Sequence, residues 1–155
     1  MLSVLLLPLL FHACHGFLVD TPCPAPAPCQ CDSSIHCERR HVISVPAAAT
    51  STSPKTFYAL YLNGNSIKII PKEAFKGYKI SRLDLSHNPV TSLDPEAFSG
   101  LEDSLLELDL ENTSLDFMPD SLATLTSLRR LNVKNNPIKS LPADIMAALG
   151  GSLLR

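Results

Sequence analysis

Apolar and polar positions along residues 57–136 follow a pattern that returns four times. Each copy has the form L-x-x-L-x-L-x-x-N, with Leu, Ile, Phe or Val at the apolar positions. The copies begin at Phe57, Ile80, Leu105 and Leu128, and their ninth residues are Asn65, Asn88, Thr113 and Asn136. These ninth residues are 23, 25 and 23 positions apart (65 to 88, 88 to 113 and 113 to 136). Such a period, repeated in register, predicts a solenoid in which each repeat forms one coil.

The middle of each copy predicts a short β-strand, because alternate side chains of x-L-x-L-x point to the same side. The inward-pointing residues are Leu60 and Leu62, Leu83 and Leu85, Leu108 and Leu110, and Leu131 and Val133. Stacking of the coils would align the strands as a parallel sheet on the concave side. The same stacking would bury these side chains in one core.

The residues after each strand predict a tight turn followed by an irregular convex segment. An Asn side chain at the turn can bind backbone groups that the turn leaves unpaired, whereas Thr113 can form fewer hydrogen bonds. Each copy then has two apolar residues, a proline and a further apolar residue. They are Ile67, Ile70, Pro71 and Phe75; Val90, Leu93, Pro95 and Phe98; Leu115, Met118, Pro119 and Leu122; and Ile138, Leu141, Pro142 and Ile145. Proline suits extended or turning backbone that joins no hydrogen-bond ladder.

The amino-terminal part of the chain predicts export. Residues 1–16 form an apolar run that ends in small residues, as a signal peptide does, and the run is too short to span a bilayer comfortably. No other stretch is long and apolar enough, so we expect no membrane segment within this chain. The sequence thus divides into a signal peptide at 1–16, a cysteine-rich cap and loop at 17–56, and about four repeats at 57–155.

Four clustered cysteines remain after residues 1–16 are removed. They are Cys23, Cys29, Cys31 and Cys37, which lie within 15 residues. On an exported chain such a cluster favours disulfides, and the spacing alone allows three pairings. The alternative is a metal site that uses Cys29, Cys31, Cys37 and His36, which an oxidising compartment disfavours.

The cysteine cluster C-x5-C-x-C-x5-C, followed by repeats with Asn-x-Ile and Pro-x-x-x-Phe, resembles that of secreted or cell-surface leucine-rich repeat proteins. The resemblance covers roughly residues 20–155. It implies an α/β leucine-rich repeat solenoid with a parallel concave sheet, a mostly irregular convex side and a disulfide-bonded amino-terminal cap. In this family the first cysteine pairs with the third and the second with the fourth, which implies Cys23–Cys31 and Cys29–Cys37. The cap would cover the apolar end of the first coil.

The sequence contains no motif for catalysis or for a cofactor. Its formal charge is −2, from 13 basic and 15 acidic residues, which favours neither nucleic acid nor an anionic membrane as a partner. Asp84 and Asp109 occupy the same strand position one coil apart, and paired carboxylates can perform acid–base chemistry. The spelling L-D-L is nevertheless typical of this strand, and His87 is interpreted as a solvated turn residue. We expect no catalytic, cofactor-binding or metal-binding residue and no enzyme activity.

The outward positions of the concave sheet are the best candidates for binding, because solenoids bind protein partners on such faces. The candidates are Tyr58, Tyr61, Arg82, Asp84, Glu107, Asp109, Arg130 and Asn132. Ala59, Ser86, Arg129 and Lys134 are also expected to point outward. Tyr58 and Tyr61 are the preferred anchors, since Tyr is enriched in interface hot spots. The alternative is an ordinary solvated face, on which Glu107/Arg130 and Glu111/Lys134 pairs serve only strand register.

These features predict a secreted, extracellular protein-binding module with a protein ligand. The alternatives are a non-catalytic accessory subunit of a secreted enzyme complex and an ectodomain fragment of a leucine-rich repeat receptor. Asn112 begins the sequon Asn112-Thr113-Ser114, so we expect N-glycosylation there, with Asn112 exposed and Thr113 pointing inward. Residues 152–155 copy the strand entry at 104–107. We therefore expect the last repeat to be incomplete, with an uncovered apolar edge that favours association.

Overall fold

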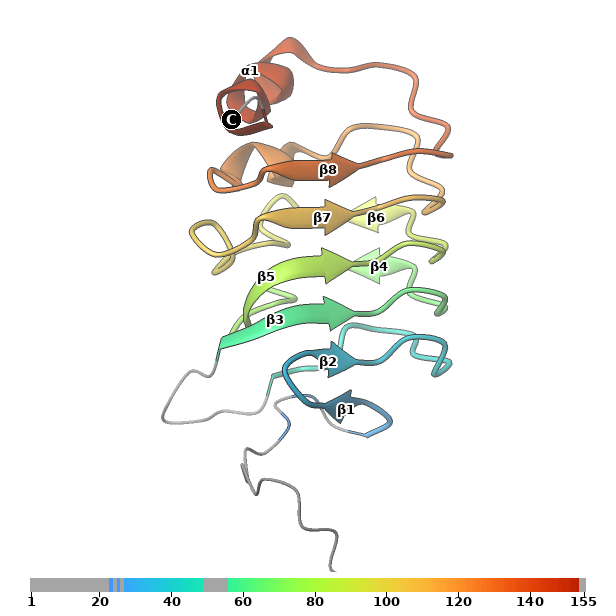
Figure 1. Ribbon diagram of the computed structural model, residues 1–155. Coiled ribbons are helices and arrows are strands. Elements are labelled where there is room, and N and C mark those ends of the chain that lie inside the picture. Colours follow the sequence, from blue (N-terminus) through green and yellow to red (C-terminus); the bar gives the residue numbers. More distant parts are fainter. Residues whose placement is uncertain (1–22, 24, 26, 49–55, 154–155) are drawn as a thin grey trace, which may run out of the picture.

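The computed structural model describes residues 23, 25, 27–48 and 56–153 of the chain. The predicted signal peptide, residues 1–16, lies outside the described residues, and so do Leu154 and Arg155. The described residues form a stack of coils whose strands lie side by side along one face (Figure 1).

One six-stranded sheet follows the concave face in the order β1-β2-β3-β5-β7-β8. The four repeats supply β3 (Thr56–Tyr61), β5 (Lys79–Asp84), β7 (Glu107–Asp109) and β8 (Arg130–Asn132). Each of the first three strands pairs in parallel with the strand of the next repeat. The predicted parallel sheet is therefore confirmed, with one strand from each copy of the sequence pattern.

The cap extends this sheet, which the cysteine spacing did not indicate. Strand β2 (Ile35–His36) pairs in parallel with β3, and β1 (Gln30–Cys31) pairs antiparallel with β2. The disulfides Cys23–Cys31 and Cys29–Cys37 hold the cap, with the pairing that the family resemblance implies. Because all four cysteines are in disulfides, none supplies a thiolate for the alternative metal site. Ile35 and Cys37 are fully buried, so the cap covers the apolar end of the first coil.

In the first three coils, the core contains the inward strand residues that the pattern predicts. The inward leucines of the first three strands are buried, and so are the convex-side residues Phe75, Phe98, Leu122 and Ile145. Phe75 and Phe98 stack with their ring centroids 5.7 Å apart. Behind the main sheet, β4 (Ile69–Ile70) and β6 (Ser92–Leu93) form a two-stranded parallel sheet, which we call the flank of the solenoid (Figure 1).

The predicted asparagines connect the coils. The Asn88 amide nitrogen donates to the carbonyl oxygens of Leu62 and Leu85, each at 2.9 Å, and its carbonyl oxygen accepts the Ile67 N–H at 3.1 Å. Thr113 donates its hydroxyl to the Leu110 carbonyl of its own coil at 2.8 Å. As its shorter side chain suggests, Thr113 does not reproduce the Asn88 contacts with the preceding coil.

The last coil differs from the others. Leu141 occupies the same repeat position as Ile70, Leu93 and Met118, which are buried, but it is 57% exposed. Leu131 and Val133 are only partly buried. No described coil stacks beyond this one, so the side chains that the core would cover remain open to solvent at this edge.

Two helical segments occupy the convex side of the last coils. They are η1 (Asp120–Thr124), a 3-10 helix, and α1 (Ala143–Leu153), an α-helix that packs on η1. Helix α1 begins after Pro142 in an Ala-rich segment, which favours helix over turn. Ile145 and Leu149 lie one turn apart and are both buried. The expected strand entry at 152–155 is therefore wrong for Ser152 and Leu153, which belong to this helix.

Candidate binding face

The concave surface is organised in columns, because residues at the same strand position lie side by side in successive coils. Strand register defines two columns of outward side chains. They are Ala59, Arg82, Glu107 and Arg130, and next to them His36, Tyr61, Asp84, Asp109 and Asn132. All eight predicted binding residues except Tyr58 lie in these columns, and Tyr58 lies one position before Ala59 on β3.

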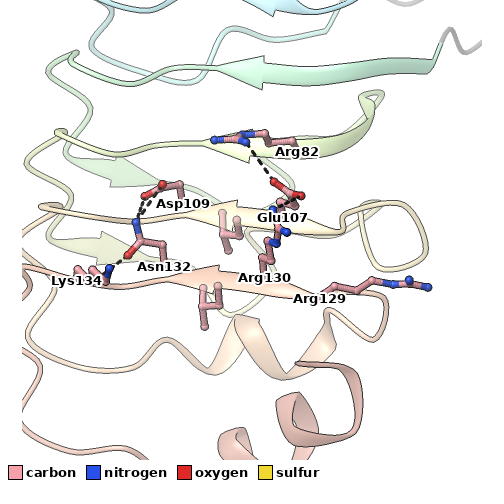
Figure 2. A pocket seen from close by; sticks show the side chains of 9 residues that line it. Arg82, Glu107, Asp109, Arg129, Arg130, Asn132 and Lys134 are labelled. Carbon is pink, nitrogen blue, oxygen red and sulfur yellow. Dashed lines mark hydrogen bonds and ion pairs between the residues drawn. The ribbon is translucent and has the colours of Figure 1, made fainter. Parts of the chain in front are cut away.

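Glu107 connects the charged residues of the first column. Its carboxylate oxygens accept from Nη1 of Arg82 at 3.2 Å and from Nη1 of Arg130 at 3.3 Å (Figure 2). The three side chains remain partly or largely open to solvent. Ion pairs of this kind contribute only about 0–1 kcal/mol each to stability. Their main effect is to hold two guanidinium groups in defined positions on the surface.

Asp84 and Asp109 are partners in strand register, as the sequence predicts. Each carboxylate accepts a backbone N–H two residues further on, from Ser86 at 3.0 Å and from Glu111 at 2.9 Å. Both oxygens of Asp109 also accept from the Asn132 amide at 3.1 Å. Both aspartates thus close the turns that follow their strands, which gives this acidic pair a structural role.

Tyr58 and Tyr61 form an aromatic end of the concave face, next to the cap. The Tyr58 side chain is 56% exposed. Its backbone N–H donates to the carbonyl of Ser33 in the cap at 2.9 Å, which fixes this end of β3. Tyr61 stacks on His36 of β2, with the ring centroids 5.3 Å apart. The first coil and the cap therefore build the aromatic end together.

His36 is a residue of this face that the binding prediction missed. Its ring nitrogens lie 3.4 Å from a carboxylate oxygen of Asp32 and 3.2 Å from one of Glu38. The backbone N–H of Ser34, which donates to Asp32, lowers the pKa of that carboxyl. The sequence signal that could have identified His36 is its pair of acidic neighbours, four residues before it and two residues after it. Its place beside Tyr61, however, depends on the pairing of β2 with β3.

An open hollow of about 490 Å³ lies at the other end of the concave face, over β5, β7 and β8 (Figure 2). Its charged lining consists of Arg82, Glu107, Asp109, Arg129, Arg130 and Lys134. Five of the predicted binding residues thus line one hollow: Arg82, Glu107, Asp109, Arg130 and Asn132. Tyr58, Tyr61 and Asp84 are not among the residues that line it.

Three expectations for this face require correction. Ala59 occupies an outward strand position but is fully buried, and Ser86 is only 7% exposed. The Glu111 carboxylate does not pair with Lys134. It accepts instead from the amides of Asn132 at 3.0 Å and Asn135 at 2.9 Å. The Glu107–Arg130 pair, in contrast, is present.

The glycosylation sequon lies at the turn after β7. Asn112 is exposed, while Thr113 is fully buried, as predicted for a turn in which one side chain faces the core. The Asn112 amide nitrogen lies 3.0 Å from Nδ1 of His87 in the preceding coil. His87 itself is exposed at its turn. Within the described part of the chain, no helix is both long and apolar enough to cross a membrane.

Comparison with known proteins shows which family this architecture resembles. The leucine rich repeat family model matches residues 55–103 and 79–138, which together cover more than half of the chain. Leucine-rich repeat-containing protein 3 of Danio rerio is 30% identical over 120 residues, covering 72% of this chain and 44% of that protein. Human opticin is 34% identical over 88 residues, covering 56% of this chain and 25% of opticin. The chain therefore spans less than half the length of these relatives.

A solved structure supports the same assignment. The crystal structure of human 5T4 (Wnt-activated inhibitory factor 1, trophoblast glycoprotein) superimposes with a TM-score of 0.55 and 27% sequence identity. The match covers 83% of this chain and 60% of the 5T4 chain. The chain thus belongs to the leucine-rich repeat family, and its disulfide-bonded amino-terminal cap is of the kind that extracellular members carry.

Proposed function

We propose that this chain is a secreted or cell-surface module that binds a protein partner with its concave face. Disulfides persist in oxidising compartments, so the two in the cap support export. Extracellular leucine-rich repeat relatives support the same location. The partner-binding role follows from the fold, because solenoids present an extended concave surface on which several coils can contact one partner.

The exposure of Tyr58 is the observation that carries this proposal. A tyrosine that is 56% exposed on a strand fixed at both sides is a preorganised anchor, since little backbone freedom is lost when a partner covers it. Tyr61 lies on the same strand and is held by His36. The charged residues beyond them would orient the partner rather than supply most of the affinity.

The proposal includes no catalytic role and no cofactor. The two carboxylates that suggested acid–base chemistry already accept hydrogen bonds from their own turns. The hollow is open and lined mainly by charged and amide side chains, whereas small-molecule sites are mostly enclosed and apolar. A partner that is itself an enzyme would make this chain an accessory subunit, with the chemistry on the partner.

The test begins with the tagged full chain, expressed in secretory cells and recovered with its bound partner. Titration of the identified partner against Tyr58→Ala and Tyr61→Ala should show affinity losses of about 2 kcal/mol or more for at least one of them. Ile69→Ala is the matched control, because Ile69 is an apolar side chain that is 60% exposed but lies on the flank strand β4. A loss of affinity with Ile69→Ala alone would place binding on the flank and refute the concave assignment.

A further inference from the structure

The carboxylates of the hollow already have hydrogen-bond partners within the chain, whereas two of its cations have none among the described residues. Glu107 accepts from two arginines, and Asp109 accepts from Asn132 and from a backbone N–H. Among the described residues, no hydrogen bond or ion pair involves the Arg129 guanidinium or the Lys134 ammonium group. Four cations and two carboxylates line the hollow, so it is positive on a chain whose formal charge is −2.

The two unpaired cations lie just before and just after one strand. Arg129 and Lys134 flank β8 (Arg130–Asn132) on either side, and Arg130 lies between them beside Glu107 (Figure 2). Arg129 and Arg130 are neighbours at the start of β8, and Lys134 lies in the turn two residues after its end. An extended peptide places alternate side chains on one side, so a segment with several carboxylates could contact cations at both ends of β8.

We propose that this hollow binds an acidic, extended segment of a protein partner, whose carboxylates pair with Arg129, Arg130 and Lys134. This inference rests on the proposed function, and it names the chemistry of the partner at one end of the concave face. Arginine binds a carboxylate through two parallel N–H donors, which makes the site selective for planar anions. Glu107 supports the site as a positioning residue, because it holds Arg82 and Arg130 in place before the partner arrives.

The surroundings favour an acidic protein segment over a uniformly charged polyanion such as a sulfated glycan. Asp84 lies in register beside Asp109, and Glu111 follows Asp109 at the end of β7. These carboxylates border the positive hollow and would repel a polyanion that continues across the sheet. A short acidic segment can pair with the cations and then continue toward the aromatic end with uncharged residues.

The test uses two labelled eight-residue peptides and the secreted full chain. One peptide repeats Glu-Ser, and the other repeats Gln-Ser as a neutral match. Fluorescence anisotropy should show binding of the Glu-Ser peptide that weakens as salt is raised, with weaker or no binding of the Gln-Ser peptide. Equal binding of both peptides, or no binding of the Glu-Ser peptide at low salt, would overturn the proposal.

Charge reversal then locates the site. The double variant Arg129→Glu/Lys134→Glu should bind the Glu-Ser peptide about tenfold more weakly. The matched double variant Lys68→Glu/Lys139→Glu reverses two exposed lysines that follow the turns, and it should bind as the parent does. Equal losses in the two double variants would show only a response to net charge and would contradict the assignment. Thermal unfolding monitored by circular dichroism checks that both variants fold.

Binding measurements with a heparin octasaccharide and with the natural partner distinguish the remaining explanations. Preferential binding of the octasaccharide, lost in Arg129→Glu/Lys134→Glu, would assign the hollow to a sulfated glycan and overturn this inference. Full affinity of that variant for the natural partner, combined with a loss in Tyr61→Ala, would refute the acidic-segment proposal and leave the concave-face proposal standing. A loss in both variants supports both proposals.

Discussion

Single side chains decide how firmly neighbouring coils are joined. Asn88 is 1% exposed and binds backbone groups of two successive coils. Thr113, at the same turn position, binds the carbonyl of its own coil and meets the amide oxygen of Asn136 from the next coil at 3.0 Å. A buried backbone group without a partner costs about 1–3 kcal/mol, so the asparagines stabilise the stack far more than their surface area suggests.

Asn88→Ala should lower the free energy of unfolding by about 2–4 kcal/mol, because it leaves the Ile67 N–H and the Leu85 carbonyl without their side-chain partner. Urea unfolding measures this loss. Asn63→Ala is the control, since the Asn63 side chain forms no hydrogen bond among the described residues and its backbone is not left-handed. Similar losses for the two variants would contradict the role assigned to the Asn88 amide.

Tyr78 provides a pH-dependent contribution to stability. Its phenol is buried and donates to the Pro46 carbonyl at 2.8 Å, and burial raises the pKa of the phenol above its ordinary value of 10.0. The fold therefore favours the protonated form. This contribution is fully present below pH 10 and is lost as the pH rises toward the higher pKa of the folded state.

Urea midpoints measured from pH 8 to about pH 11 should therefore fall more steeply for the parent than for Tyr78→Phe, which cannot ionise. Below pH 9, Tyr78→Phe should be less stable by about 1 kcal/mol, because it lacks the hydrogen bond to Pro46. Tyr58→Phe, which removes a phenolic hydroxyl at an exposed position, is the control variant. Parallel curves for the parent and Tyr78→Phe would show that Tyr78 does not titrate differently in the folded state.

The elements of each coil contribute unequally to the core. The strands supply the inward leucines, and the convex segments supply Phe75 and Phe98, which stack across two coils. Leu122 of η1 and Ile145 of α1 take the same place in the later coils and are equally buried. The convex segments change from turns to a 3-10 helix and an α-helix along the chain. The side-chain position is nevertheless kept, because each coil must fill the same space behind the sheet.

Phe98→Ala should destabilise the fold by about 3–5 kcal/mol, since the ring is fully buried and its loss leaves a cavity beside Phe75. Thermal or urea unfolding of the variant gives this value. Phe117→Ala removes an identical side chain that is 41% exposed, and it should cost far less. If Phe117→Ala proved as damaging as Phe98→Ala, the convex aromatic stack would not be the source of the stability.

At the scale of the whole molecule, the two ends of the concave face differ in chemistry. The cap end presents Tyr58, Tyr61 and His36, and the far end presents the positive hollow. The sequon at Asn112 lies at the turn beside the hollow, with its backbone N–H bound to the Lys134 carbonyl.

We expect partial N-glycosylation of Asn112 in the protein recovered from secretory cells, because the side chain is exposed. Peptide N-glycosidase should reduce the mass of a fraction of the parent protein. Asn112→Gln should show no such shift. Absence of any shift in the parent would count against glycosylation at this turn and would weaken the case for export.

The sequence by itself determined the repeats, the inward residues and the parallel sheet, because these follow from a local side-chain period and from the burial of apolar groups. It also indicated that Thr113 connects neighbouring coils less well than an asparagine at the same turn position, since a hydroxyl forms fewer hydrogen bonds than an amide. The candidate face was predictable to the same extent. Alternation along each strand identifies which side chains point outward, and the repeat length aligns them in columns.

Only the tertiary structure decided which outward residues meet. Whether the Glu111 carboxylate binds Lys134 or the two asparagines depends on how far side chains extend from one coil to the next. A pattern within one repeat does not contain this information. The stacking of His36 on Tyr61 required β2 of the cap to join the sheet. The sequence of the Leu141 repeat follows the same pattern as the other repeats. The exposure of Leu141 therefore depends on what stacks against its coil. Burial and pairing between coils are properties of neighbours in space, whereas the repeat pattern describes one coil at a time.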